Sequence, residues 1–378
     1  MRNNYKRLGD YIEEVKVRNT DLMAKELLGI NIDKFFMPSV ANIVGTDLSV
    51  YKIVKKNQFA CNRMHVGRDF RLPISMSKSE NEFMVSPAYD VFEIVDTEVL
   101  SPEYLMMWFS RREFDRNAWF YTDADVRGGL HWKALCDMQL PIPSIAKQLE
   151  IVKEYNVVTN RIKLNQQLIQ KLEETAQAIY KLWFVGGQEV INKTTLRQYI
   201  TTNPQLSIKK NSISTYIEMS DLTTTSMRIA GAIKREFISG SKFQNHDTLL
   251  ARITPCLENG KTAFVDILEK SEIAAGSTEF IVMRAKKNIS PYWVYCLARD
   301  ENFRSYAISS MVGSSGRERV HEKYLENFVL PEINSDKMND FHSKAEPIFK
   351  MINVKSTEVV NLTILQDLLL SKLATIKN

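Results

Sequence analysis

The sequence predicts an α+β fold in which two globular domains follow one another, each succeeded by a long helix, and the two helices pair as a coiled coil about a pseudo-two-fold axis. Three observations lead to this prediction. The chain has 378 residues, more than one ordinary domain needs. It matches itself at an offset of about half its length, and each half ends in a sustained apolar repeat of helical spacing. The predicted boundaries are 1–145 for the first domain, 146–188 for the first helix, 189–333 for the second domain and 334–378 for the second helix.

The repeat consists of short matches that occur in the same order at an offset of 188 to 191. One such match would be chance, whereas an ordered set indicates duplication. The paired positions are Leu8 and Leu196, Arg63 and Arg252, Ser101-Pro102 and Ser290-Pro291, Arg127 and Arg317, His131 and His321, and Leu140-Pro141 and Leu330-Pro331.

Each domain mixes strands and helices. The apolar runs at 90–95 and 279–284 predict strands. The segments 101–114 and 290–303 predict helices, because a serine cap is followed by proline at the first helical position in both.

The two long helices carry apolar residues at alternating spacings of four and three, which is typical of a coiled-coil seam. Asn165 and Lys355 occupy the same seam position, where a polar residue fixes register at a cost in stability. The alternative is two unrelated amphipathic helices, each packed on its own domain; the equal phase of the two seams favours pairing. Pro347 predicts that the second helix breaks or starts early, since proline lacks the N–H donor. The seam positions are 151, 155, 158, 162, 165, 169, 172, 176, 179 and 183, and then 341, 345, 348, 352, 355, 359, 362, 366, 369 and 373.

Composition excludes several classes of protein. The mean hydropathy is −0.24 and no apolar run approaches the length that a bilayer requires, so we expect no membrane association. The four cysteines are scattered without a CxxC pair, which fits a reducing cytoplasm. The net charge of +5 is small, so any contact with nucleic acid must come from local patches.

No motif indicates catalysis. The sequence has no P-loop, no GxGxxG after a strand and no Asn/Asp-Pro-Pro-aromatic run. Glu14-Val15-Lys16 faintly suggests a nuclease, but a solvated helix face is the favoured interpretation. The histidines lack metal-binding spacing, and the repeated pair His131 and His321 is explained equally well by structural hydrogen bonds. We therefore expect no catalytic residue, no cofactor and no metal in this chain.

Several stretches mix basic residues with aromatic residues and glycine, the composition of a nucleic-acid surface. Arginine suits this role because its planar fork meets phosphate or guanine bidentately. For any single arginine an ordinary surface charge is the simpler interpretation; taken together, the loops 63–71, 121–133 and 311–323 favour DNA contact. The candidate DNA-binding residues are Arg63, His65, Arg68, Arg71, Arg111, Arg112, Arg116, Arg127, Lys133, Arg252, Arg299, Arg304, Arg317, Arg319 and Lys323.

The junction LPIPSIAKQLEIV (140–152) and the helix end AQAIYKLWFV (176–185) resemble the corresponding segments of type I restriction–modification specificity subunits. The order of domain, helix, domain, helix is also similar. Lys147-Gln148 stands where that family usually has Glu-Gln, and the second junction, LPEINSDKMNDF (330–341), departs from the pattern.

This resemblance implies a non-catalytic DNA-recognition subunit with two target-recognition domains, each reading one half of an asymmetric bipartite target in double-stranded DNA. It also implies two partner modification subunits, which are adenine-N6 methyltransferases that bind S-adenosylmethionine, and restriction/translocase subunits that use ATP and Mg. The implied location is the cytoplasm of a bacterium or archaeon.

Two other classes stay open. A non-catalytic scaffold with two protein-interaction domains on a coiled coil predicts no salt-sensitive DNA binding. An enzyme with an unrecognised site predicts activity in the isolated chain.

Overall fold

The computed structural model describes residues 5–42, 44–64, 66–122, 128–186, 192–314 and 316–376. The chain divides into two units: Met1–Ile162 with Asn361–Asn378, and Lys163–Val360. Over these ranges, no helix combines the length and the apolar character needed to cross a membrane.

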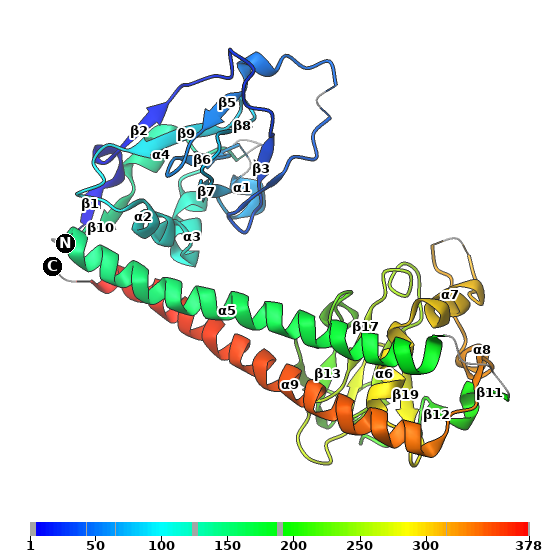
Figure 1. Cartoon of the computed structure of the whole chain (residues 1–378). Helices are drawn as coiled ribbons and strands as arrows, with labels where there is room; N and C mark the ends of the chain where they lie inside the picture. Colours follow the sequence, from blue (N-terminus) through cyan, green and yellow to red (C-terminus); the bar gives the residue numbers. More distant parts are fainter. Residues whose placement is uncertain are drawn as a thin grey trace. The chain divides into compact units, whose positions relative to one another are not determined.

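The first unit is built on a four-stranded antiparallel sheet in the order β2-β9-β6-β7 (Figure 1). Its buried side chains, such as Phe59, Phe92 and Phe109, pack between this sheet and short helices. The four strands are β2 (Ile12–Val15), β9 (Asp90–Ile94), β6 (Phe59–Cys61) and β7 (Ile74–Met76), and the helices are α1 (Val66–Asp69), α2 (Pro102–Phe109), α3 (Arg112–Phe120) and α4 (Trp132–Asp137).

Three two-stranded sheets complete the first unit. They pair β1 (Tyr5–Arg7) with β10 (Gln139–Pro141), β3 (Leu28–Ile30) with β4 (Phe36–Pro38), and β5 (Lys52–Val54) with β8 (Phe83–Val85); 3-10 turns cover Leu8–Asp10 and Leu48–Val50.

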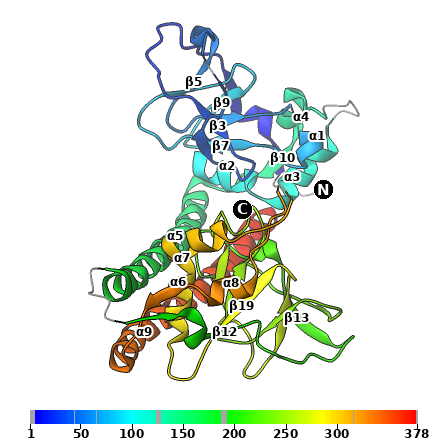
Figure 2. The same cartoon turned by 90° about the vertical axis from the view of Figure 1, so that its right-hand side faces the viewer.

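The second unit repeats this topology, and Figure 2 labels two strands of its main sheet, β12 and β19. Its main sheet has the order β12-β19-β16-β17, and β11 pairs with β20 as β1 pairs with β10. The fold class predicted from the sequence is confirmed. The elements are β11 (Lys193–Thr195), β12 (Ile200–Thr202), β16 (Thr248–Ala251), β17 (Thr262–Phe264), β19 (Phe280–Ala285), β20 (Val329–Pro331), α6 (Pro291–Arg299), α7 (Glu301–Ser309) and α8 (Glu322–Glu326), with 3-10 turns at Leu196–Gln198 and Met219–Asp221.

The second unit also has a four-stranded sheet where the first has only short pairs. Its order is β14-β13-β18-β15, with β13 parallel to β18 and antiparallel to β14. The strands are β13 (Ile213–Ile217), β14 (Ile233–Glu236), β15 (Ser241–Phe243) and β18 (Ala274–Gly276).

The predicted strands at 90–95 and 279–284 are confirmed as β9 and β19. The helices predicted over 101–114 and 290–303 are confirmed at their starts, where Ser101 and Ser290 precede the first helical proline, but neither segment is one continuous helix. In both units a helix ends and a second one begins. Asp300 explains the break in the second unit: its buried carboxylate accepts hydrogen bonds from the Asn302 and Phe303 N–H groups and starts α7. In the first unit, Arg111 has an extended backbone at the same point.

Two long helices run through both units: α5 (Ile145–Tyr180), extended by a π-helical turn at Lys181–Val185, and α9 (Ser335–Lys372), followed by a 3-10 turn at Leu373–Thr375. Every predicted seam position is buried or half-buried. Within the first unit the start of α5 packs against the end of α9, where the Gln366 amide donates to Thr159 Oγ1 at 2.8 Å. Within the second unit the end of α5 meets the start of α9, with the rings of Phe184 and Phe341 5.3 Å apart. The two helices therefore pair antiparallel.

The predicted break at Pro347 is wrong, because α9 continues through it. Pro347 is exposed, and so is Ser343, whose carbonyl loses its N–H partner. That carbonyl can be hydrated, while the buried side chains of Ala345 and Phe349 hold the helix on both sides of the proline.

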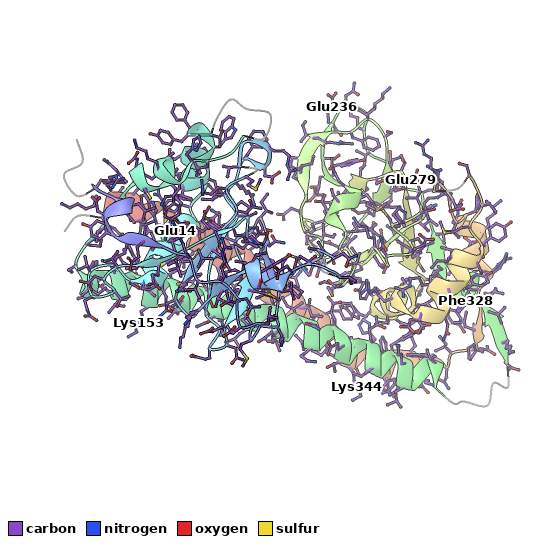
Figure 3. The ribbon with its side chains drawn as sticks, turned by 90° about the horizontal axis from the view of Figure 1, so that it is seen from above. Glu14, Lys153, Glu236, Glu279, Phe328 and Lys344 are labelled. Carbon is purple, nitrogen blue, oxygen red and sulfur yellow. The ribbon has the colours of Figure 1, made fainter. Side chains whose placement is uncertain are left out.

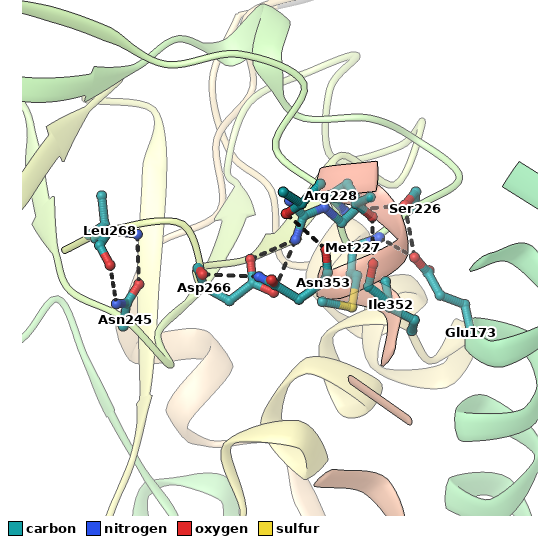
Figure 4. A network of polar contacts seen from close by, with 11 residues as sticks. Glu173, Ser226, Met227, Arg228, Asn245, Asp266, Leu268, Ile352 and Asn353 are labelled. Atoms are coloured by element: carbon teal, nitrogen blue, oxygen red, sulfur yellow. Dashed lines mark hydrogen bonds and ion pairs between the residues drawn. The ribbon is translucent and has the colours of Figure 1, made fainter. Parts of the chain in front are cut away.

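A polar network joins both long helices to the second domain within the second unit (Figure 4). Glu173 of α5 accepts hydrogen bonds from Ser226 Oγ at 2.8 Å and from the Met227 N–H at 2.7 Å. Asn353 of α9 donates to the Asp266 carbonyl at 3.1 Å, and the Asp266 carboxylate pairs with Arg228 at 2.8 Å. Burial raises the pKa of the Glu173 carboxyl above its ordinary value, although its hydrogen bonds oppose this shift, and burial likewise raises the pKa of Asp266.

Candidate nucleic-acid interface

The first unit brings together arginines from two separate sequence clusters. Arg71 from the loop after α1 and Arg112 and Arg116 from α3 line one surface depression of about 570 Å³, together with Phe70. Each arginine has a carboxylate neighbour, but all three side chains are at least half exposed. Exposed ion pairs contribute little to stability, so these guanidinium groups can exchange their partners for phosphate at low cost.

Two residues that line this depression, Lys34 and Asp115, form a buried ion pair that stabilises the fold. Lys34 pairs with Asp115 at 2.8 Å, and both side chains are largely buried. Burial lowers the pKa of the Lys34 ammonium group, and the nearby Asp115 charge opposes this shift. Asp115 also accepts from the Leu72 N–H, so the pair joins α3 to the loop that carries Arg71.

A second depression in the first unit is lined by Arg63, His131, Trp132 and Lys133. Arg63 lies over the Trp132 ring, pairs with Asp90 and donates to the Leu130 carbonyl, so its guanidinium is engaged within the fold. Lys133 is exposed and extends from the start of α4.

Arg111 and Arg68 differ from the other candidates of this unit. Arg111 is 5% exposed and its guanidinium lies 4.2 Å from the centroid of the Trp108 ring, so it belongs to the packing of α2. Arg68 is exposed and binds the neighbouring Asp69. His65 and Arg127 lie outside the described residues.

In the second unit, two candidates form ion pairs near the end of β16. Glu279, labelled in Figure 3, accepts hydrogen bonds from Arg319. The Nε and Nη2 atoms of Arg319 donate to its carboxylate at 2.7 to 3.0 Å. This bond lowers the pKa of the Glu279 carboxyl. Arg252 lies 4.0 Å from Glu322 and is only partly exposed. The exposed candidates of this region are Arg317 and Lys323.

Arg299 and Arg304 lie against a turn of the second domain. The Arg299 guanidinium donates to the carbonyls of Thr224 and Gly260 at 3.0 and 2.9 Å. A Cβ on Gly260 would lie 2.7 Å from the Arg304 guanidinium, so the two arginines pack on the same glycine. Both side chains are half-buried in this structure.

The same backbone hydrogen bond precedes an exposed lysine in each unit, and we call this arrangement the repeated frame. The Leu130 N–H donates to the Arg63 carbonyl at 3.0 Å, and the Val320 N–H donates to the Arg252 carbonyl at the same distance. Lys133 and Lys323 follow these bonds as the second residues of α4 and α8, and both are exposed. The repeat therefore places one mobile positive charge at an equivalent point of each unit.

Sequence reasoning missed a basic surface on the second unit. Residues 204–246 contain six basic and three acidic residues, whereas residues 16–50 of the first unit contain four of each. The signal was this local charge excess, in a segment that also contains Tyr216, Gly231 and Gly240. Arg235 lies over the Tyr216 ring, with 3.3 Å between the guanidinium carbon and the ring centroid. The six basic residues are Lys209, Lys210, Arg228, Lys234, Arg235 and Lys242, of which Arg228 is largely buried in its ion pair with Asp266.

The interpretation of one small motif is wrong. Glu14 lies in strand β2, so the helix face expected there is wrong. Among the described residues, no three His, Cys, Asp or Glu side chains come together in a group that could hold a metal ion.

Comparison with known proteins gives related proteins of one kind. No family model matches the chain. It is 25% identical over 245 residues to the EcoEI type I restriction enzyme specificity subunit of Escherichia coli, and 37% identical over 90 residues to the EcoAI specificity subunit of the same organism. These matches cover 62% and 24% of this chain but only 40% and 15% of the relatives, so the chain spans about two fifths or less of their length.

The fold also has a solved counterpart. The crystal structure of the type I restriction–modification S subunit from M. genitalium aligns with 99% of this chain and 96% of its own, with a TM-score of 0.61 and 12% identity. The chain is thus similar, in sequence and in fold, to the specificity subunits of type I restriction–modification systems, which confirms the resemblance seen in its motifs.

Proposed function

We propose that this chain is the DNA-recognition subunit of a type I restriction–modification complex, and that each unit reads one half of an asymmetric bipartite target in double-stranded DNA. The observation that carries this proposal is the repeated frame of the two units. The sheet order and the Lys133/Lys323 position recur, while the surrounding surface differs. Two units that share a fold but differ in their surface side chains are suited to recognise two different half-sites.

The exposed basic residues have complementary tasks in this proposal. Phosphate contacts position a protein on the duplex, and contacts with base edges specify the sequence. Lys133 and Lys323 suit phosphate, because lysine is a point charge on a flexible stem. Arg112, Arg116 and Arg317 have the planar fork that meets guanine bidentately.

The chemistry is proposed to come from partner subunits. In this scheme the chain is not an enzyme and holds no cofactor; two adenine-N6 methyltransferase subunits bring S-adenosylmethionine, and restriction/translocase subunits use ATP and Mg. The long helices offer docking surface, since apolar side chains remain exposed along them. Figure 3 labels Lys153 and Lys344, exposed charged residues on the same helices. Exposed apolar side chains on α5 and α9 include Leu149, Val157, Leu164, Val354, Val360, Ile364 and Leu368. The domain boundaries at 145, 188 and 333 and the cytoplasmic location stay predictions.

The test is reconstitution with candidate modification subunits, followed by sequencing of methylated adenines. We expect methylation within one bipartite motif, and only when both components are present. Methylation by this chain alone would overturn the non-catalytic assignment. Absence of methylation together with absence of salt-sensitive DNA binding would favour the protein-interaction scaffold.

Paired variants then assign half-sites to units. Arg127→Ala and Lys133→Ala should affect one half-site, and Arg317→Ala and Lys323→Ala the other. A lost phosphate contact weakens binding to all sequences and lowers the slope of log K against log salt by about one, whereas a lost base contact relaxes specificity at one position.

A further inference from the structure

We propose that an aromatic cluster on the first unit, made of Phe70, Trp119, Phe120 and Tyr121, inserts against the base stack of the half-site that this unit reads. This inference rests on the proposed function and adds a mode of recognition to it. It assigns a role to four aromatic side chains that lie in or beside the basic stretches predicted from the sequence.

All four rings are exposed to an unusual degree. Phe120 is 78% exposed, Phe70 60%, Tyr121 54% and Trp119 45%. Phe70 packs edge-on against Trp119 with ring centroids 5.3 Å apart, and Phe120 packs edge-on against Tyr121 at 5.4 Å. These two exposed ring pairs lie at one helix end and its neighbouring loop, and exposed apolar patches of this kind mark interaction sites.

The backbone that positions Phe70 adopts a strained conformation. Phe70 has φ of +57°, a left-handed conformation that is strained for a bulky side chain. Its segment is held by Gly67, whose N–H donates to the Gly128 carbonyl at 2.7 Å. A Cβ on either glycine would lie 2.7 Å or less from the other's Cα, so only glycine permits this approach. Such strain persists where surrounding structure enforces it, and it concentrates at functional sites.

The helix end that carries the other rings is fixed as well. Thr122 donates from its backbone N–H and from Oγ1 to the Trp119 carbonyl, at 3.1 and 2.7 Å. The Tyr121 N–H donates to the Asn117 carbonyl at 3.2 Å. Trp119, Phe120 and Tyr121 are therefore displayed from an ordered helix terminus.

The cluster is continuous with the arginine depression described above. Phe70 lines that depression together with Arg71, Arg112 and Arg116. Apolar rings beside exposed guanidinium groups match the chemistry of DNA, whose bases offer flat apolar faces next to a chain of phosphates. Proteins use aromatic and aliphatic wedges in this way to unstack a base step while basic residues hold the backbone.

The second unit lacks the cluster at the equivalent place. Helices α3 and α7 correspond, since Phe114 and Phe303 are both buried, as are Ala118 and Ala307. At the same offset, Trp119, Phe120 and Tyr121 correspond to Ile308, Ser309 and Ser310. The shared core is kept and only the exposed rings differ, which indicates that the rings serve a partner of the first unit.

The proposal predicts an asymmetric deformation of the target. The half-site read by the first unit should be unstacked at one step and should favour a flexible pyrimidine–purine step there, even where no side chain reads that base pair. The other half-site should keep ordinary stacking.

The experiment uses the reconstituted complex and a duplex carrying the motif found by methylation sequencing. 2-Aminopurine is placed at successive positions outside the methylated adenines, and its fluorescence reports unstacking. We expect an increase at one position in one half-site with the wild-type chain. The increase should be lost in the double variant Trp119→Ala/Phe120→Ala and kept in Phe120→Tyr, which preserves the ring.

Affinity supplies a second readout. The double variant should bind the target at least about fivefold more weakly, because each stacked ring contributes substantially to binding. The slope of log K against log salt should not change, since a ring releases no counterions. Ser309→Ala, at the equivalent position of the second unit, is the matched control and should leave both readouts unchanged.

Each other outcome overturns the inference in a recognisable way. Wild-type methylation without any local fluorescence change would reject the wedge and leave the proposed function standing. Loss of the methyltransferase subunit from the complex in the double variant, with unchanged DNA binding by the chain itself, would make the cluster a protein-docking surface. Absence of DNA binding by the wild-type complex would reject the proposed function. Thermal melting of the variants shows that the exposed substitutions leave the fold intact.

Discussion

The two units build the same junction between domain and long helix with different chemistry. In the first unit, Gln148 is fully buried and makes three hydrogen bonds: it accepts from the Ser101 N–H and donates to the carbonyls of Val99 and Pro143, all at 2.8 to 2.9 Å. Met338 stands at the equivalent place in the second unit and lies inside an apolar cluster. This explains why the second junction departs from the sequence pattern while its backbone does not.

The side chains that pack near the junctions also differ between the two units. In the second unit, Phe349 packs against Tyr292 and Phe264, with centroids 4.6 and 5.3 Å away. At the corresponding positions, 188 to 190 residues earlier, the first unit has Met76, Glu103 and Thr159, which line a cavity of about 520 Å³. Duplicated folds thus keep strand order and backbone hydrogen bonds, while side-chain contacts are free to change from polar to aromatic.

The largest effect that tests this comparison comes from the aromatic packing. Phe349→Ala should lower the free energy of unfolding by about 3–5 kcal/mol, since a buried ring is lost and a cavity is left. Thr159→Ala, its counterpart in the first unit, removes few contacts and should cost about 1 kcal/mol or less, mainly through the lost bond to Gln366. Urea unfolding followed by fluorescence measures both. Equal effects would show that the two sites are packed alike.

The junction itself gives the next largest effect. Gln148→Leu leaves the Ser101 N–H and the carbonyls of Val99 and Pro143 without this partner and should destabilise the first unit by about 1–3 kcal/mol. Met338→Leu keeps apolar volume and should cost less than about 1.5 kcal/mol. Chemical denaturation of both variants tests this order, and a cost for Met338→Leu that exceeds the cost of Gln148→Leu would contradict it.

A pH dependence near the ordinary pKa of glutamate should arise in the second unit, where Glu173 connects α5 with its domain. The pKa of Glu173 is raised in the folded chain, so the folded state holds this proton more tightly than the unfolded state does. The free energy of unfolding should therefore decrease as pH rises from about 4.5, the ordinary value for glutamate, to the raised folded value.

Glu173→Gln should remove this part of the pH dependence, because the amide oxygen can still accept from Ser226 and Met227 but does not titrate. Asp266→Asn should reduce the dependence in the same direction, since its pKa is also raised. Denaturation at a series of pH values compares the slopes. A slope that is unchanged in both variants would place the titrating groups elsewhere.

The smallest effect concerns the seam of the long helices. Asn165 is 3% exposed, and within the described structure its Nδ2 has no hydrogen-bond partner. Asn165→Leu should raise the free energy of unfolding by about 1 kcal/mol, since a buried unpaired group is removed. Lys355→Leu at the matching position should change it less, because Lys355 is half-buried and already paired with Glu358. Thermal melting resolves the two, and a loss of stability in Asn165→Leu would show that this residue is needed for register.

The sequence could predict those parts of the fold that depend on periodicity. The strands at 90–95 and 279–284 and the long seam follow from alternation and 3-4 spacing, which a single sequence displays. The break between α6 and α7 could not be predicted, because it depends on a buried aspartate that accepts two backbone bonds. Pro347 gave the wrong expectation, since tertiary packing on both sides outweighs one lost hydrogen bond.

The candidate interface was predictable only in part, because the sequence gives residue type but not exposure. Residue type located the basic clusters, and the structure brings Arg71 together with Arg112 and Arg116. Residue type does not tell whether a guanidinium is exposed, and Arg111 is buried on Trp108 while Arg112 beside it is 86% exposed. The basic segment around Arg235 could have been found from its charge balance, since residues 204–246 contain six basic and three acidic residues.

The antiparallel pairing of the long helices has a consequence for the order in which a ribosome delivers the chain. The core of the first unit includes Leu370 and Leu373, and the Tyr5 hydroxyl donates to the Ala374 carbonyl at 3.0 Å. These partners emerge after every residue of the second unit, which ends at Val360. The unit whose synthesis begins first is therefore completed last. Its apolar cluster, which includes Val152, lacks Leu370 and Leu373 until translation ends.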